Sequence, residues 1–105
     1  DVVLVDAPCS GSGTWRRTPD AKWRLTPAHL AGLEKTQAQI LDTAAAHVAP
    51  GGALAYMTCS LLRAENRAQT AAFLRRAPEF ALLTERIFTP LDASDGFYLC
   101  LMQRR

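Results

Sequence analysis

The sequence has no long hydrophobic run, no close cysteine pair and almost no excess of charge of either sign. No apolar stretch approaches the roughly 18 residues that a membrane-spanning helix needs, and the best runs are Val2–Val5 and Ala53–Met57. The 12 Lys and Arg residues nearly cancel the 10 Asp and Glu residues, which leaves a net charge of +2. With 105 residues, 49% of them hydrophobic and 21% charged, the composition is that of one folded domain at most and argues against disorder.

The three cysteines are too far apart in the sequence to indicate a zinc site. Neither a Cys-x-x-Cys pair nor a nearby histidine accompanies Cys9, Cys59 or Cys100. The chain opens on a strand-like run and has no secretory signal, so we expect reduced thiols and a cytoplasmic protein. Each thiol is then either buried apolar filler, the usual role of a lone cysteine, or part of the chemistry. A Walker phosphate loop and a Ser-His-Asp constellation are also missing.

The order of the expected elements predicts an α/β fold. Val2–Val5 is short, β-branched and apolar, as in a strand buried on both faces of a parallel sheet. Thr26 and Pro27 predict a helix start, and Pro50-Gly51-Gly52 predicts its end. The remaining expected elements are a strand at Ala53–Thr58, a helix at Arg63–Arg76, and strands at Phe80–Leu83 and Gly96–Met102. This order indicates a mostly parallel sheet that ends in an antiparallel hairpin.

Two of the cysteines follow the carboxyl ends of expected strands, where open α/β sheets form their sites. Cys9 comes three residues after Asp6, and Cys59 comes directly after Thr58. If the two strands are neighbours, about 4.8 Å apart, both thiols and the Asp6 carboxylate point into one crevice. A helix N-terminus right after Cys59 would favour its thiolate, which is the nucleophilic form. The alternative is that both cysteines are small residues in tight turns.

The segment between Ser10 and Leu25 gathers basic and aromatic side chains. Its members are Trp15, Arg16, Arg17, Lys22, Trp23 and Arg24. Basic residues bind phosphates and aromatic rings stack on unpaired bases, so single-stranded nucleic acid is a predicted partner. The alternative, which composition alone favours, is a solvated loop whose tryptophans pack on the core.

The chain resembles the Sun-type RNA cytosine-5 methyltransferases, which use S-adenosylmethionine. The matching motifs are Asp6-Ala-Pro-Cys9-Ser-Gly-Ser-Gly13, Arg17-Thr-Pro-Asp20-Ala-Lys-Trp23-Arg24, Thr58-Cys59-Ser60 with Glu65-Asn66 behind it, and Asp95-Gly96-Phe97-Tyr98. A Pro-Cys motif and a Thr-Cys-Ser motif in this order and at this separation form a specific signal.

The resemblance implies methylation of cytosine carbon 5 in RNA, ribosomal RNA rather than transfer RNA. Cys59 matches the nucleophile that adds to carbon 6, so that carbon 5 can take the methyl group. Cys9 matches the thiol that assists product release, and Asp6 matches the carboxylate that hydrogen-bonds the cytosine. Asp6 and Pro8 are also expected at the cofactor site. The target base must be unpaired or flipped out, which suits an RNA-binding role for Arg16, Arg17, Lys22, Trp23 and Arg24.

The resemblance covers only part of the family's catalytic domain. The Gly-rich cofactor turn and the acidic residue after the second strand have no counterpart, because the chain begins at what resembles the fourth strand. We therefore expect residues 1–105 to be the C-terminal half of a Rossmann-like methyltransferase domain, without the cofactor-binding N-terminal half and inactive alone. The strand at Val2–Val5 would then expose an edge through which the chain can homodimerise.

Two alternatives belong to other classes of protein. One is a non-catalytic RNA-binding or interaction module that keeps the sheet without the reaction. The other is a thiol redox protein, which ranks last because Cys9 and Cys59 are 50 residues apart and redox pairs favour Cys-x-x-Cys or a comparable geometry.

Overall fold

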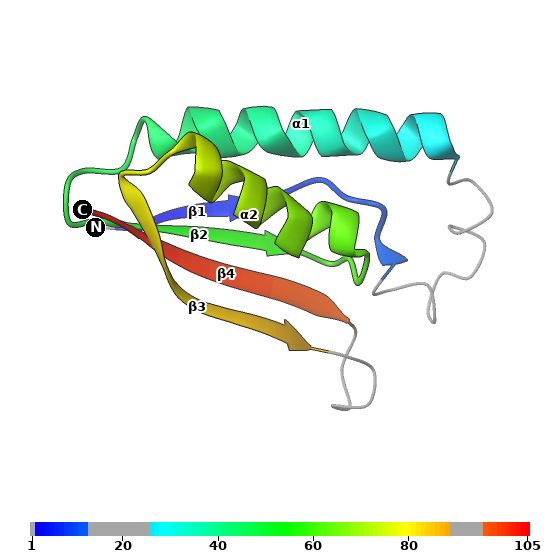
Figure 1. Ribbon diagram of the computed structural model, residues 1–105. Coiled ribbons are helices and arrows are strands. Elements are labelled where there is room, and N and C mark those ends of the chain that lie inside the picture. The colour runs from blue at the N-terminus through cyan, green and yellow to red at the C-terminus, as the bar shows by residue number, and fades with distance from the viewer. Residues whose placement is uncertain (1, 13–25, 89–95) are drawn as a thin grey trace.

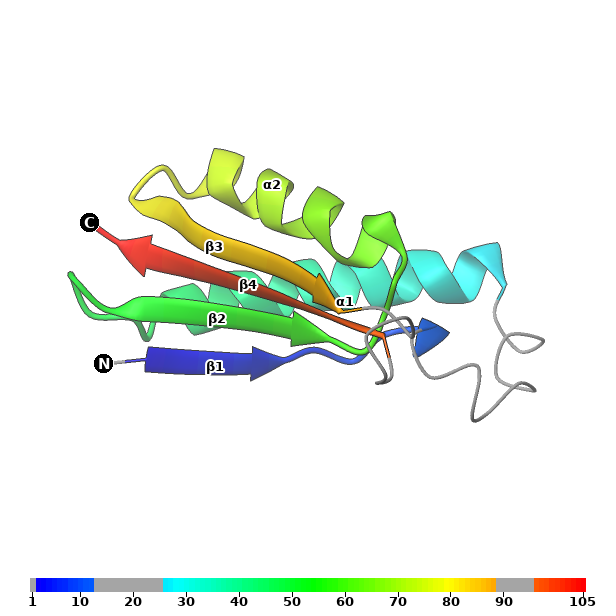
Figure 2. The same cartoon turned by 90° about the horizontal axis from the view of Figure 1, so that it is seen from below.

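The computed structural model describes residues 2–12, 26–88 and 96–105. The elements in chain order are β1 (Val2–Asp6), α1 (Pro27–Ala45), β2 (Ala53–Thr58), the 3-10 helix η3 (Arg63–Glu65), α2 (Arg67–Arg76), β3 (Phe80–Phe88) and β4 (Phe97–Arg104). Figures 1 and 2 show both α-helices on the same face of one sheet. No helix in the described ranges is long and apolar enough to cross a membrane.

The four strands lie in the order β1-β2-β4-β3. Strand β1 pairs parallel with β2, whereas β4 pairs antiparallel with both β2 and β3. The predicted α/β fold and its terminal antiparallel hairpin are confirmed. Because β4 inserts between β2 and β3, parallel pairing among the described strands is confined to β1 and β2.

The N-terminus of α1 forms as the sequence predicts. The Thr26 side chain accepts a hydrogen bond from the His29 backbone N–H at 3.1 Å, and Pro27 occupies the first turn. These contacts satisfy an N–H that has no partner within the helix. After the helix ends at Ala45, Gly51 turns the chain with a φ of 85°, a conformation that favours glycine.

The second predicted helix, Arg63–Arg76, is interrupted. The first three residues form η3, and α2 begins only at Arg67. Between them Asn66 leaves helical geometry, with φ −112° and ψ −101°. Its side chain accepts a hydrogen bond from Thr58 Oγ1 at 2.6 Å and donates one to the Ser60 carbonyl at 2.7 Å. These tertiary contacts outweigh the local helical preference.

Strand β3 is longer than predicted and extends to Phe88 instead of Leu83. Its second half, Thr84-Glu85-Arg86, is polar because β3 is an edge strand with one solvated side. A register irregularity between Leu82 and Thr84 also breaks the alternation of side chains. The apolar run alone therefore marks only the start of this strand.

The core lies between the sheet and the two helices. Its largest fully buried side chains include Leu41 and Phe73 from the helices and Leu54, Tyr56, Tyr98 and Met102 from the strands. The rings of Tyr56 and Tyr98 meet edge to face with centroids 6.3 Å apart, a favoured aromatic geometry.

The prediction that the Val2–Val5 strand is buried on both faces is wrong. Val5 is buried toward the helices, but Val2 and Leu4 are 64% and 62% exposed. Successive side chains of a strand point to opposite faces, and both described helices cover the face that Val5 joins. The other side of β1, and its outer edge, are open in the described part of the chain.

Candidate active site

The parallel pairing of β1 with β2 brings two cysteines together. Asp6 lies opposite Met57, and the Ala7 N–H extends the ladder by donating to the Met57 carbonyl at 2.9 Å. The segments that follow β1 and β2 then leave the sheet side by side, and the Sγ atoms of Cys9 and Cys59 come within 3.3 Å of each other. The thiols are therefore close in space although they are 50 residues apart in sequence. The hypothesis of a thiol redox protein was ranked last because of that separation in sequence, and this reason does not hold.

The two thiols differ in environment. Cys59 is exposed, whereas Cys9 is partly buried. Burial, and next the hydrogen bond with Cys59, raise the pKa of Cys9 from the ordinary 9.0 to about 12. Near neutral pH Cys9 therefore keeps its proton, and Cys59 is the thiol that an incoming electrophile can reach. Cys100 is fully buried in β4, as expected of an apolar filler.

The helix start that the sequence places at Arg63 is only the short 3-10 helix η3, so no helix N-terminus lies directly after Cys59. Three residues intervene before η3, and α2 begins at Arg67. The turn is built from side chains instead, since the Ser60 N–H donates to Thr58 Oγ1 at 3.2 Å. A helix dipole falls off within its first turn, so α2 does not supply the thiolate stabilisation that the sequence suggested.

Asp6 and Pro8 are exposed at the carboxyl end of β1. Asp6 lines a hollow of about 490 Å³ between β1 and α1, together with Ile40 and His47. The Pro8 carbonyl accepts a hydrogen bond from Gln37 Nε2 at 2.9 Å, which fixes the chain just before Cys9. The exposed Asp6 carboxylate beside this hollow can contact a polar ligand, whereas Pro8 is not among the residues that line it.

The predicted RNA-binding residues Arg16, Arg17, Lys22, Trp23 and Arg24 lie outside the described residues. No group of three metal-binding side chains occurs in the part of the chain that the structure describes.

A polar cluster behind the thiols was not found from the sequence. Its centre is Glu65, which is 0% exposed. The Glu65 carboxylate accepts hydrogen bonds from the Ser10 N–H (2.8 Å), Ser10 Oγ (2.5 Å), Ser60 Oγ (2.5 Å) and Gln37 Nε2 (3.0 Å). Ser12 Oγ adds a further link by accepting from the Leu61 N–H at 2.7 Å. The Glu65-Asn66 motif and the serines that follow both cysteines were the available signals.

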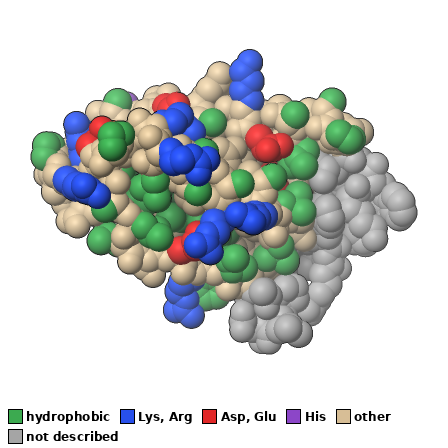
Figure 3. All heavy atoms as spheres, in the orientation of Figure 1, with side chains coloured by type: hydrophobic (Ala, Val, Ile, Leu, Met, Phe, Trp, Pro, Cys, Tyr) green, Lys and Arg blue, Asp and Glu red, His purple; other side chains and the backbone are tan. Residues whose placement is uncertain are grey.

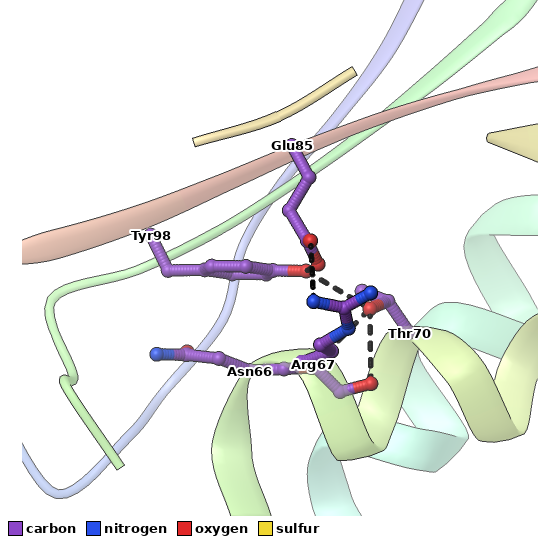
Figure 4. Close-up of polar contacts among 5 residues, drawn as sticks. All are labelled: Asn66, Arg67, Thr70, Glu85 and Tyr98. Atoms are coloured by element: carbon purple, nitrogen blue, oxygen red, sulfur yellow. Dashed lines mark hydrogen bonds and ion pairs between the residues drawn. The ribbon is translucent and has the colours of Figure 1, made fainter. Parts of the chain in front are cut away.

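A second polar cluster joins α2 to the hairpin (Figure 4). Tyr98 donates its hydroxyl proton to Glu85 Oε2 at 2.6 Å and lies 2.9 Å from Thr70 Oγ1. Arg67 approaches Glu85 at 3.7 Å. Burial, followed by the Glu85 contact, raises the pKa of Tyr98. The cluster fixes the start of α2, and with it Glu65 and Asn66, against β3 and β4.

The sequence of this chain is similar to those of known methyltransferases. Residues 1–102 match the family model described as 16S rRNA methyltransferase RsmB/F. Ribosomal RNA small subunit methyltransferase B of Salmonella arizonae is 52% identical over 82 residues, which are 78% of this chain and 19% of that protein. The chain thus spans about a fifth of the length of this curated relative.

Solved structures show the same fold. The crystal structure of PH0851 superposes with a TM-score of 0.94 at 34% identity, covering 99% of this chain and 26% of that one. The structure of NSun6 from Pyrococcus horikoshii with SFG gives a TM-score of 0.82 at 22% identity, covering 96% of this chain and 29% of that one. With the family model matching 102 of the 105 residues, the chain belongs to the 16S rRNA methyltransferase RsmB/F family.

Proposed function

We propose that the protein containing this chain methylates carbon 5 of a cytosine in ribosomal RNA, with Cys59 as the nucleophile. The observation that carries this proposal is an exposed thiol 3.3 Å from a second, partly buried thiol just past the ends of two parallel strands. Membership of an rRNA methyltransferase family supports RNA as the substrate. We place the reaction in the cytoplasm, where thiols stay reduced.

The reaction begins at Cys59. Its thiolate adds to carbon 6 of the cytosine. This addition converts the double bond between carbons 5 and 6 into a single bond and makes carbon 5 electron-rich. S-adenosylmethionine, when bound, supplies the methyl group that carbon 5 takes. A water molecule then takes the carbon 5 proton, the electrons of that C–H bond restore the double bond between carbons 5 and 6, and the Cys59 sulfur leaves as a thiolate. The target base must leave the RNA stack to reach this thiol.

Cys9 assists the last step. Because the pKa of Cys9 is raised to about 12, this thiol keeps its proton near neutral pH. Its S–H lies within hydrogen-bond distance of the Cys59 sulfur and stabilises that sulfur as it departs with a negative charge. Without this donor, the covalent bond between the protein and the RNA breaks more slowly.

The remaining contacts are assigned to residues around the thiols. Asp6, exposed at the end of β1, hydrogen-bonds the cytosine ring, and Asp6 and Pro8 line one side of the methyl-donor site. The basic and aromatic residues Arg16, Arg17, Lys22, Trp23 and Arg24 hold the RNA backbone and its unpaired bases. The face that carries α2 and β3 also presents more basic than acidic side chains (Figure 3).

Residues 1–105 form part of the methyltransferase catalytic domain in this proposal. In this proposal the chain contributes both thiols and Asp6 but only part of the cofactor site, so we expect it to bind S-adenosylmethionine weakly by itself. Isothermal titration of the 105-residue chain with S-adenosylmethionine tests this expectation, and tight binding would contradict it.

Two substitutions in the intact protein test the mechanism. Cys59→Ala removes the nucleophile, and we expect no methylation of ribosomal RNA above background. Cys9→Ala is expected to accumulate a protein–RNA adduct, seen as a slower band on a denaturing gel, and Cys100→Ala serves as the matched control. Wild-type turnover by Cys59→Ala would reject the assignment. RNA binding without methylation by the wild-type protein would favour a non-catalytic RNA-binding module.

A further inference from the structure

Glu65 connects the two segments that carry the reactive thiols. Ser10 directly follows Cys9, and Ser60 directly follows Cys59. Both serine hydroxyls donate to the same carboxylate oxygen, Glu65 Oε1, each at 2.5 Å. The other oxygen, Oε2, accepts from the Ser10 backbone N–H at 2.8 Å. The residue after each thiol is thus held by one side chain.

The carboxylate is itself held in place from the helical layer. Gln37 of α1 donates from Nε2 to Glu65 Oε2 at 3.0 Å and to the Pro8 carbonyl at 2.9 Å. Gln69 of α2 in turn donates to Gln37 Oε1 at 3.2 Å. The Tyr56 hydroxyl donates to the Glu65 backbone carbonyl at 2.7 Å. Both helices and β2 therefore fix Glu65 before any substrate arrives.

Only a carboxylate satisfies this arrangement. A carboxylate has two acceptor oxygens with about four lone-pair positions, and the four hydrogen bonds from Ser10, Ser60 and Gln37 use all of them. A glutamine of the same shape has one acceptor oxygen and places an N–H₂ group against donors. Glu65 is fully buried, so water cannot replace the lost acceptor.

We propose that Glu65 is a positioning residue that sets the separation of the Cys9 and Cys59 thiols. This inference rests on the proposed function. Glu65 acts through Ser10 and Ser60, and in the described part of the chain its carboxylate makes no hydrogen bond to either sulfur. Loss of the carboxylate frees both segments, so the thiols no longer meet in the geometry that the reaction needs. A misplacement of about 1 Å is enough to lower a rate roughly 100-fold.

The experiment compares Glu65→Gln with wild type in the intact protein. Glu79→Gln is the matched control because Glu79 is an exposed carboxylate just before β3, at the opposite end of the sheet from both thiols. We expect Glu65→Gln to lower kcat on ribosomal RNA about 100-fold with little change in KM for RNA. Glu79→Gln should keep both constants.

A second readout measures thiol separation without RNA or methyl donor. Hydrogen peroxide oxidises one thiol to a sulfenic acid, which condenses with the other thiol and releases water. In total, two thiols and one peroxide give a disulfide and two waters, and peptide mass spectrometry measures the rate. Glu65→Gln should form the Cys9–Cys59 disulfide several-fold more slowly than wild type and Glu79→Gln.

The two readouts separate this proposal from the proposed function. If the wild-type protein methylates no RNA but its disulfide formation still depends on Glu65, the proposed function is rejected and the positioning role of Glu65 is supported. A wild-type disulfide rate in folded Glu65→Gln overturns the positioning role, whatever its kcat. If Glu65→Gln does not fold, as judged by circular dichroism, Ser10→Ala replaces it. Ser10→Ala removes one of the hydroxyl links, and an unchanged disulfide rate in that variant overturns the proposal.

Discussion

The raised pKa of Cys9 predicts a large difference in alkylation rate between the cysteines. Only the thiolate reacts with iodoacetamide at an appreciable rate. At about pH 8, a thiol with the ordinary pKa of 9.0 is roughly 10% ionised, whereas one with a pKa of about 12 is roughly 0.01% ionised. We therefore expect Cys9 to react about 1,000-fold more slowly than an ordinary exposed thiol.

Peptide mass spectrometry can follow each cysteine separately. Cleavage after Arg16, Lys35, Arg63, Arg86 and Arg104 places Cys9, Cys59 and Cys100 on different tryptic peptides. Exposed Cys59 should be labelled first, while Cys9 and buried Cys100 should remain unlabelled until the protein is unfolded. Urea-unfolded protein is the control, in which all three should react at similar rates.

The same shift predicts the sign of a pH effect on stability. The folded state raises the pKa of Cys9 from 9.0 to about 12, so it favours the protonated thiol. Its contribution is fully present below pH 9.0 and is lost as the pH rises towards 12. Between pH 9.0 and about pH 12, the free energy of unfolding of Cys9→Ser should therefore fall less than that of the wild-type protein. Labelling of folded Cys9 as fast as Cys59 near neutral pH would contradict a raised pKa for Cys9.

Two further predictions concern stability and association. Tyr98→Phe should lower the free energy of unfolding in urea by about 1.5–3 kcal/mol, because the lost hydroxyl donates to the Glu85 carboxylate; Tyr56→Phe, which loses a bond to a neutral carbonyl, should cost only about 1 kcal/mol. We also expect the 105-residue chain to homodimerise through the edge of β1 (Val2–Asp6) that no other described strand covers, with Leu4, which is 62% exposed on the adjoining face, packing at the contact. Leu4→Lys should weaken that association in sedimentation velocity, and a strictly monomeric wild-type chain at high concentration would contradict the prediction.

Local sequence signals predict much of the fold because they act over a few residues. The Thr26-Pro27 start of α1 and the β1 and β2 strands follow from capping and from short apolar runs. The break at Asn66 does not, since it depends on hydrogen bonds to Thr58 and Ser60. The polar second half of β3 is likewise a strand only because β4 pairs with it.

The sequence by itself determined most of the elements, their order and the location of Cys9 and Cys59 just past the ends of two strands, but not the break at Asn66 or the full length of β3. It also carried the motifs of the methyltransferase family. The tertiary structure decided that β1 and β2 are parallel neighbours, which brings the thiols to 3.3 Å, and that the pKa of Cys9 is raised. It alone revealed Glu65 as the common acceptor for both thiol-bearing segments. The physical reason is that burial and hydrogen bonding between distant residues exist only after the chain has folded.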